Sequence, residues 1–392
     1  MEITSTMWAG LDWGQLPQQL IFGLGIGAIY ALIALGYTMV YGVLRLINFA
    51  HGEVFMLGAY TALFTSWWFG FRPEDLLKTP QQGTILILLI MILASMVFCA
   101  LIGVIIERFA YRPMRNQPRI ASLITAIGVS LLLQYGGALI LPNSPPPAIS
   151  SKVSPFADQI TLQIRPPDAA LAQAAEEKKK EFEVANTAFE KQLASEKSRF
   201  DLSPAGKELR DARLEAEREN KKAQDAALAS GYKLIVPSGQ LIMLLTTVIL
   251  MTMLYFLVMK TKTGRAMRAV SHDFDSAGLM GINVNSIVTI TFVIGSALAG
   301  AGAMMNATFV GTPLTTFYGV QLGVKAFVAA VLGGIGNIPG AVLGGILMGV
   351  AETLVVWAGY SQYKDAIAFL ILILVLLVRP GGLLGSAKVE KV

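Results

Sequence analysis

The chain has 392 residues, of which 54% are hydrophobic and 15% charged, and its mean hydropathy is +0.59. These values are typical of a polytopic membrane protein and exclude an ordinary soluble globule. The formal net charge of +5 combines two populations, because residues 176–225 hold 12 Lys and Arg against 13 Asp and Glu, and the remainder holds 19 against 13. The membrane part is therefore modestly basic, which suits contact with anionic lipid and does not imply a nucleic-acid partner.

Runs without charged residues locate the expected membrane spans. In chain order they are 14–44, 54–71, 79–106, 120–151, 234–259, 276–324, 326–351 and 366–378. The longer runs can cross about 30 Å of hydrocarbon as helices. The run 276–324 holds one span and the start of another, broken near "GTPLTTFYG". We therefore expect an all-α polytopic membrane protein with about eight or nine transmembrane helices. The number nine requires residues 322–335 to cross as a short span, and a re-entrant segment there is the alternative.

Basic clusters set the expected orientation, because Lys and Arg next to a span resist translocation. One cluster is "ERFAYRPMRNQPR" at 107–119, and the other lies within 260–268. Both are expected in the cytoplasm. Counting spans outward from them places residues 72–83 and 142–237 outside.

The two chain ends follow from the same count. The first segment carries Glu2 and Asp12 and no cation, so we expect it on the outer, periplasmic side. Arg379, Lys388 and Lys391 favour a cytoplasmic C-terminus. We also expect the run 14–44 to be an uncleaved span, because it is too long for the apolar core of a signal peptide.

Three parts are expected along the chain: an N-terminal membrane part at 1–150 with about four helices, a charged insert at 151–233, and a C-terminal membrane part at 234–392. The insert opens with a proline-rich stalk, "LPNSPPPAISSKVSPF", which cannot be helical. Its Ala, Glu and Lys content from 168 to 230 then favours two antiparallel helices outside the membrane.

The details of the insert follow from a few side chains. Ser203 and Pro204 are suited to the start of its second helix. A thin apolar seam is expected from Phe182, Phe189, Leu193 and Phe200. A solvated, partly disordered loop is the alternative.

A polar island, "KTKTGRAMRAVSHDFDSAGLMGINVNSI", occupies residues 260–287 between two apolar runs. Its second half predicts a short cytoplasmic helix that presents small apolar side chains to a partner; an ordinary loop is the alternative. Asp273 or Asp275 can cap the first turn, and Gly281 can end the helix. The candidate residues for this coupling segment are Asp273, Asp275, Ala277, Gly278, Leu279, Met280, Gly281 and Ile282.

The stretch "YGVLRLINFAHGEVFMLGAY" at 41–60 places Arg45, Asn48, His51 and Glu53 between two apolar spans. If it is a cytoplasmic turn, these side chains are solvated. If it is unwound backbone at membrane depth, they line a cavity, since unpaired polar groups do not face lipid. Asn48, His51 and Glu53 are therefore translocation-path candidates, together with Asn337 in the tight turn "IGNIPG".

Two charged residues within apolar runs, Lys325 and Glu352, are candidates for an ion pair. In the nine-span count both lie below the external interface at similar depth, with Lys325 near the outer end of a short span. A lone charge at the membrane centre costs about 2.5–3.5 kcal/mol, so pairing is favourable. The alternative is that Lys325 reaches the headgroups and Glu352 faces a wet cavity.

Several chemistries are not supported by the sequence. It has no GxxxxGK[ST] loop for ATP and no GxSxG nucleophile motif. Its metal-ligating candidates, His51, His272 and Cys99, lack the spacing of a zinc site. We therefore expect neither an enzyme nor a cofactor or metal bound by this chain.

Four blocks of the sequence carry a family resemblance: "YALIALGYTMVYGVLRLINFAHGEVFMLGAY", "ERFAYRPMRNQPRIASLITAIGVS", "GRAMRAVSHDFDSAGLMGIN" and "KAFVAAVLGGIGNIPGAVLGGILMGVAE", with "VEKV" at the end. With them the chain resembles the permease of bacterial high-affinity branched-chain amino acid ABC importers. The resemblance covers everything except the insert, which departs from the family pattern of a short loop.

The resemblance implies an inner-membrane permease paired with a second, paralogous permease, two cytoplasmic ATPase subunits that use ATP, and a periplasmic substrate-binding protein. It places the coupling helix at 274–283. Substrates would be branched-chain or other apolar amino acids, with urea or short amides as the alternative within the family. A membrane scaffold or receptor without transport is the alternative from a different class.

Overall fold

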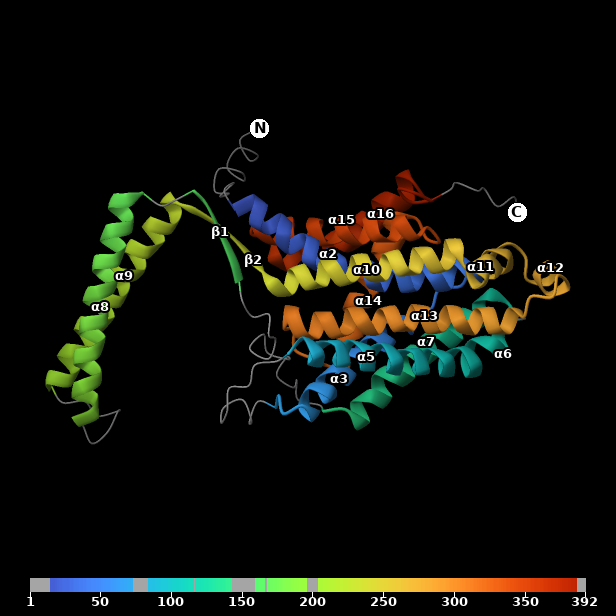
Figure 1. Cartoon of the computed structure of the whole chain (residues 1–392), viewed down its shortest axis with the longest axis horizontal. Coiled ribbons are helices and arrows are strands. Elements are labelled where there is room, and N and C mark those ends of the chain that lie inside the picture. The colour runs from blue at the N-terminus through green and yellow to red at the C-terminus, as the bar shows by residue number, and fades with distance from the viewer. Residues whose placement is uncertain are drawn as a thin grey trace. The chain divides into compact units, whose positions relative to one another are not determined.

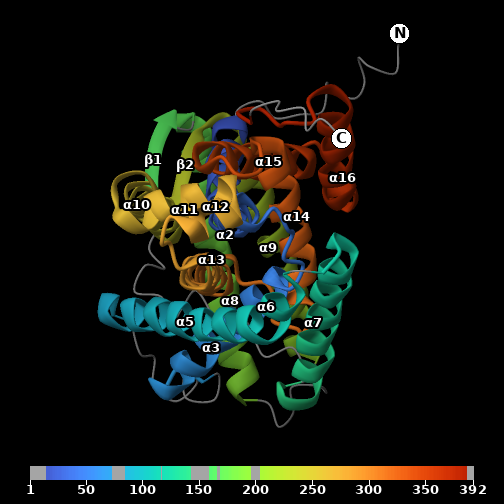
Figure 2. The ribbon, with the colours of Figure 1, turned by 90° about the vertical axis from the view of Figure 1, so that its right-hand side faces the viewer.

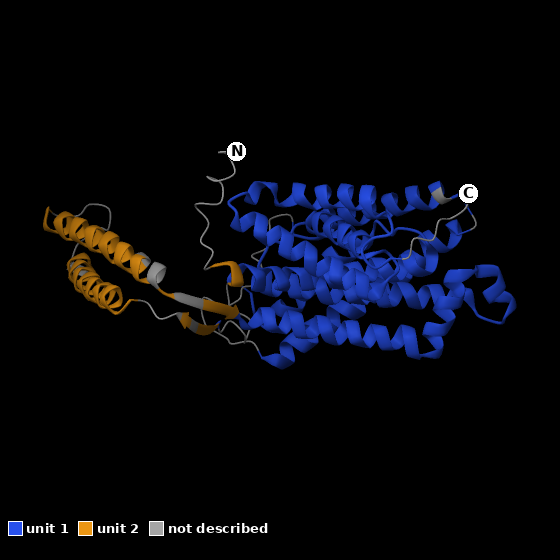
Figure 3. Ribbon diagram, turned by 90° about the horizontal axis from the view of Figure 1, so that it is seen from above, with its two compact units in different colours: residues 1–11, 18–159, 237–392 blue, residues 12–17, 160–236 orange. Residues whose placement is uncertain are grey.

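A computed structural model describes residues 15–72, 84–115, 117–142, 159–165, 168–195 and 204–385. The described chain divides into two compact units, coloured separately in Figure 3. The larger unit draws its residues from 18–159 and 237–392, and the smaller mainly from 160–236. The N-terminal and C-terminal membrane parts expected from the sequence thus belong to one unit. Glu2 and Asp12 near the N-terminus lie outside the described residues, as do Lys388 and Lys391 near the C-terminus.

The larger unit is a helix bundle (Figure 1). Its long helices are α2 (Leu16–Leu44), α3 (His51–Trp68), α5 (Ile85–Ile106), α7 (Arg119–Ile140), α10 (Ser238–Lys260), α13 (Val284–Met305), α14 (Tyr318–Gly333), α15 (Ile338–Trp357) and α16 (Lys364–Val378). Between α10 and α13 lie α11 (Lys262–His272) and α12 (Phe274–Leu279). Short helical turns are η2 (Glu107–Tyr111), α6 (Arg112–Met114), η4 (Asn306–Val310) and η5 (Ser361–Tyr363).

Seven helices in the described ranges are long and apolar enough to cross a membrane. The shorter α14, with 16 residues, and α3, which carries His51 and Glu53, pack in the same bundle. With these two the count agrees with the eight or nine expected, and the all-α polytopic fold is confirmed. The break near "GTPLTTFYG" lies between η4 and α14. However, α14 begins at Tyr318, four residues before the expected start of the short span.

The centre of the bundle is formed by α2, α3, α13 and α14, because most of their residues are buried. Figure 2 shows α13 between α2 and α5. Small residues allow this approach: a Cβ on Gly295 would lie 3.2 Å from the Gly36 oxygen, and one on Gly300 would lie 2.5 Å from the Ser95 oxygen. Lipid tails are as apolar as Leu, so close backbone packing of this kind supplies much of the stability.

The helices α2 and α15 also cross closely. A Cβ on Gly27 would lie 2.7 Å from Ile346 Cα, and one on Gly349 would lie 2.3 Å from the Gly27 nitrogen. Both distances are shorter than real Cβ contacts, so only glycine fits at these positions. In "GAVLGGILMG", Gly345 and Gly349 face α2, whereas Gly340 and Gly344 face α14.

The smaller unit contains α8 (Ala169–Ser195), α9 (Pro204–Ser230), β1 (Gln159–Arg165) and β2 (Tyr232–Pro237). The helices pack as a hairpin, as Figure 1 shows, and the strands pair as a two-stranded sheet. Pro204 opens α9, while Ser203 and Phe200 lie outside the described residues. The strands were not expected; the alternation of Ile160, Leu162 and Ile164 in "QITLQIR" is the signal that indicates β1.

The helix hairpin has a mixed seam. Phe189 is buried, and Phe182 and Leu193 are half-buried. The Arg213 guanidinium stands 5.4 Å from the Phe189 ring centre. Across the seam Lys178 Nζ lies 2.7 Å from Glu219 Oε2, and hydrogen bonds from Lys178 lower the pKa of that exposed carboxyl. Polar contacts thus supplement the thin apolar seam.

Candidate permeation site and coupling helix

The link from α2 to α3, residues 45–50, turns the chain back into the bundle. Arg45 has φ 54° and is the only described residue other than glycine in the left-handed region. Its backbone N–H donates to the Tyr41 oxygen, and its exposed guanidinium donates to the Ser271 oxygen at 3.3 Å. After this turn Asn48 is 2% exposed and His51 is 1% exposed. The structure therefore places these side chains in the protein interior rather than in solvent.

His51 and Glu53 lie in the first turn of α3, three residues earlier than the helix start expected from charge alone. The His51 ring meets Tyr37 edge-on at 4.6 Å, and its Nε2 has no hydrogen-bond partner among the described residues. Glu53 is 1% exposed, and its Oε1 accepts from Ser130 Oγ at 3.0 Å. Its Oε2 has no partner within the described chain. Buried polar atoms without partners are costly, so these two atoms are the open hydrogen-bonding positions of the candidate site.

A buried polar network extends from Asn48. Tyr111 Oη donates to Asn48 Oδ1 at 3.0 Å. One turn earlier Glu107, 1% exposed, accepts from Arg115 at 2.9 Å and from Thr289 Oγ1 at 3.0 Å. From the sequence, Glu107 and Arg115 are only parts of a basic cluster expected in the cytoplasm. The hydrogen bond between Thr289 and Glu107 joins α13 to η2 beside the candidate site. The single Glu among four arginines is the sequence signal for this network.

A cleft of about 1320 Å³ opens between the C-terminal end of α2 and the neighbouring ends of α10, α11, α14, α15 and α16. Its polar lining includes Thr38, Arg45, Arg268, His272 and Asn337. Asn48, His51 and Glu53 do not line it. The cleft and the His51 site are connected through two rings, because Phe327, which lines the cleft, contacts Tyr37 at 5.9 Å.

Asn337 therefore lies apart from the other translocation-path candidates. It caps α15, with its Oδ1 accepting from the Gly340 N–H at 3.0 Å. Its Nδ2 donates to the Leu384 oxygen at 2.7 Å. Both side-chain groups thus hold the backbone of this turn together, which is a structural role at the edge of the cleft.

The polar island forms α11 and α12 at one end of the bundle (Figure 1). Asp273, not Asp275, is the N-cap of α12. Its carboxylate accepts from the backbone N–H groups of Asp275 and Ser276 and from Ser276 Oγ at 2.7 Å. These hydrogen bonds, with that of the Ser276 side chain first, lower the pKa of Asp273. Gly281 follows with φ 82°, as a helix end requires.

The apolar side chains of the coupling segment divide into two groups. Leu279 is 90% exposed and Met280 is 83% exposed. Ala277 is buried, and Ile282 packs against the core, so Ile282 does not share their exposure. A Cβ on Gly278 would meet nothing within 4 Å. Leu279 and Met280 are thus two large apolar side chains that project from a polar loop and pack against nothing in the described chain.

Lys325 and Glu352 come together in the structure: Lys325 Nζ lies 2.7 Å from Glu352 Oε1, and both are buried. Asp365 and Tyr30, which were not predicted from the sequence, complete a cluster around this ion pair. Asp365 Oδ1 lies 2.6 Å from the same Nζ, and Tyr30 Oη donates to Glu352 Oε2 at 2.5 Å. The cluster connects α2, α14, α15 and α16. Lys325 is about two turns into α14 rather than near the end of the helix.

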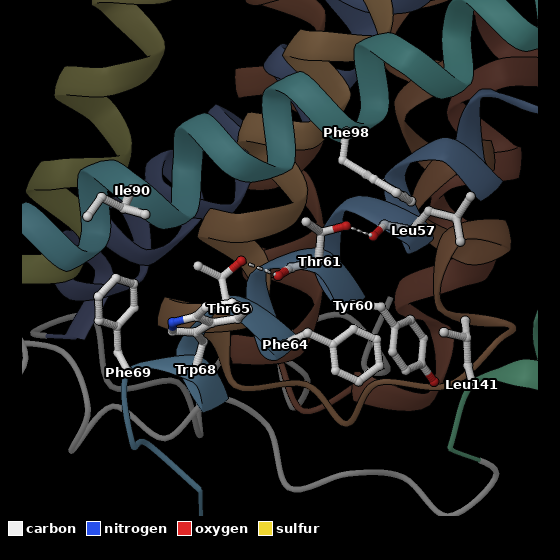
Figure 4. Close-up of a pocket in the computed structure, with 10 residues that line it drawn as sticks. All are labelled: Leu57, Tyr60, Thr61, Phe64, Thr65, Trp68, Phe69, Ile90, Phe98 and Leu141. Atoms are coloured by element: carbon white, nitrogen blue, oxygen red, sulfur yellow. Dashed lines mark hydrogen bonds between the residues drawn. The ribbon is translucent and has the colours of Figure 1, made fainter.

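A separate apolar pocket lies between α3 and α5, next to Leu141 at the end of α7 (Figure 4). Its volume is about 430 Å³. Five aromatic rings line it: Tyr60, Phe64, Trp68, Phe69 and Phe98. None of the sequence-based candidates lies in this pocket.

Comparison with known proteins identifies the family. The family model described as "Branched-chain amino acid transport system / permease component" matches residues 19–376. The chain belongs to this family. The resemblance carried by the four sequence blocks is therefore confirmed. No solved structure matches the chain.

Individual members of this permease family are similar over nearly the whole length. The chain is 35% identical to the high-affinity branched-chain amino acid transport system permease protein BraD of Pseudomonas aeruginosa, over 96% of this chain and 97% of BraD. It is 34% identical to the permease protein LivH of Escherichia coli K12 over 96% and 97% of the two chains. LivH of Salmonella typhimurium is 33% identical with the same coverage. The names of these relatives describe transport permeases, not enzymes.

Proposed function

We propose that this permease is a membrane subunit of an ATP-driven importer that moves branched-chain amino acids into the bacterial cytoplasm. The family and the full-length relatives support the transport of branched-chain amino acids over that of urea or short amides. A scaffold or receptor without transport has no such support. The chain would not hydrolyse ATP itself, since its sequence contains no P-loop.

The observation that carries the coupling proposal is the exposure of Leu279 and Met280. Apolar side chains that are 90% and 83% exposed on a short capped helix require a partner surface if they are to leave water. In this proposal they fill a groove of a cytoplasmic ATPase subunit, and α12 transmits its movement to the bundle. The Asp273 cap and Gly281 keep α12 short and fix both its ends.

The substrate path would pass the start of α3. Asn48, His51 and Glu53 are buried polar residues where one helix ends and another begins, as in transporters whose broken helices bind substrate. On the cytoplasmic side the path would continue into the cleft edged by Arg45 and Asn337, beyond the Tyr37 and Phe327 rings. A second, paralogous permease would close the path, and a periplasmic binding protein would deliver the substrate.

The orientation proposed here follows from the basic helix α11. Lys260, Lys262, Arg265 and Arg268 lie beside α12, which favours a cytoplasmic location for this end of the bundle. The N-terminus is then periplasmic and the C-terminus cytoplasmic. The smaller unit, between α7 and α10 in the chain, is placed in the periplasm.

The experiment that tests this function is ATP hydrolysis by the reconstituted importer. The complex should contain this chain, the paired permease and the ATPase subunits, with the binding protein loaded with leucine, isoleucine or valine. Hydrolysis should rise when the loaded binding protein is added and should not rise with urea or acetamide. Stimulation by amides alone, or by none of these ligands, would contradict the proposed substrate class.

A further inference from the structure

The apolar pocket between α3 and α5 has no role in the proposed transport path. From its geometry we infer that it holds one anionic phospholipid, with an acyl chain in the pocket and the phosphate at Arg72. The proposal does not depend on the coupling role of α12 or on the substrate class. It requires only that the bundle lies in a membrane, which the family supplies.

The lining of the pocket is suited to hydrocarbon. Thr61 and Thr65 contribute hydroxyls, but each donates to the backbone oxygen one turn earlier, at 2.8 and 2.7 Å, as the dashed lines in Figure 4 show. Neither hydroxyl proton is left for a polar ligand. The other lining side chains are aliphatic or aromatic, and the volume of about 430 Å³ is within the range of ligand sites.

The pocket is open on the side that faces the membrane. Phe64 is 41% exposed, Phe98 is 40% exposed and Trp68 is 88% exposed. The face of α5 next to the pocket continues with exposed Leu86, Leu89 and Leu93. A surface of this kind is covered by lipid in a membrane, so an acyl chain can reach the pocket from the bilayer.

The Tyr60 hydroxyl indicates that the occupant carries a polar glycerol ester and is not a plain hydrocarbon. Tyr60 is 1% exposed, and its hydroxyl has no hydrogen-bond partner among the described residues. Figure 4 shows the Tyr60 ring beside Leu141, which follows the last turn of α7. An ester carbonyl at the level of this helix end would accept the Tyr60 proton and remove the cost of an unpaired hydroxyl.

The charge for the headgroup is supplied at the C-terminal end of α3. The Arg72 guanidinium stands 5.9 Å from the Trp67 ring centre, and Trp67 meets Phe64 of the pocket at 5.5 Å. Trp at a helix end is typical of the membrane–water interface, and a cation there attracts a phosphate. The acyl chain, ester and phosphate of one lipid therefore each have a matching group.

The test is native mass spectrometry of the full-length chain after extensive washing in detergent, with a mixture of phosphatidylglycerol and phosphatidylcholine added back. The wild type should retain one phospholipid and prefer phosphatidylglycerol. Thr61→Phe fills the pocket without breaking a tertiary hydrogen bond and should abolish retention. The matched control is Thr252→Phe on α10, where an exposed Thr makes the same bond to the preceding turn and lines neither this pocket nor the cleft.

Arg72→Gln gives an independent result that does not depend on repacking. It should leave the lipid bound and lower the preference for phosphatidylglycerol about fivefold, the effect of losing one interfacial cation. Equal retention by the Thr61 and Thr252 variants, or equal binding of the two headgroups by the wild type, would overturn the proposal. Loss of the lipid when the chain joins the complete importer would also overturn it, because another subunit would then occupy the pocket.

Discussion

At the scale of single residues, the cluster around Lys325 shows most clearly how charge is kept inside the bundle. The one cation lies between Glu352 and Asp365, and Tyr30 occupies the second oxygen of Glu352. The two carboxylates differ in environment, because Glu352 is buried and the Asp365 side chain is 47% exposed. Asp365 also lies in the first turn of α16, where the helix dipole favours a negative charge.

This geometry determines the expected result of exchanging the two charges. Lys325→Glu with Glu352→Lys restores an ion pair but places a new carboxylate beside Asp365, so it should recover little folded protein. Adding Asp365→Asn removes the repulsion and should restore more. Either single change at Lys325 or Glu352 leaves a buried charge unpaired and should cost about 3–5 kcal/mol. Asp365→Asn alone should cost at most about 1 kcal/mol. The amount of folded protein recovered after detergent extraction compares all five variants. Harmless single changes at Lys325 and Glu352 would rule out a structural pair.

At the scale of elements, the crossing of α2 and α15 depends on glycine. Gly349→Leu should force the two backbones apart, at a cost of about 1–3 kcal/mol or more for overpacking. Gly128→Leu on α7 is the control, since a Cβ there would meet nothing within 4 Å. Thermal unfolding in detergent should show a lower midpoint for Gly349→Leu only. Equal midpoints would mean that the helices do not meet as closely as described.

At the scale of the whole molecule, the chain combines the helix bundle with the smaller unit, whose helices pack against each other. The hairpin of α8 and α9 contains the Lys178–Glu219 bridge and the Phe189–Arg213 contact, so its stability comes from within the smaller unit. Replacing residues 166–231 by a short Gly/Ser linker should therefore leave uptake detectable. We favour a peripheral contact of this unit with the binding protein or the partner permease. If the shortened protein reaches normal levels but takes up nothing, the unit is required for transport.

Much of this arrangement could be predicted from the sequence, because lipid imposes strong local rules. The apolar runs gave the spans, and "HDFDSAGLMG" indicated α12 with a cap and a glycine end. The sequence could not choose Asp273 over Asp275, since both spacings permit a cap. It also missed Tyr30 and Asp365, because no local pattern reports which distant helices meet Glu352. Ile282 was expected to belong to the coupling segment with Leu279 and Met280, but it is half-buried against the bundle.

The central claim is that this permease is driven through α12, and Leu279→Asp tests it most directly. Hydrolysis of ATP and uptake of labelled leucine should be measured in the same proteoliposomes containing the complete importer. The matched control is Val184→Asp on α8, where an apolar side chain is 70% exposed on the smaller unit. The account predicts that Leu279→Asp keeps the folded membrane protein but loses uptake per ATP hydrolysed, while Val184→Asp behaves as the wild type. Wild-type uptake per ATP in the Leu279 variant would contradict it.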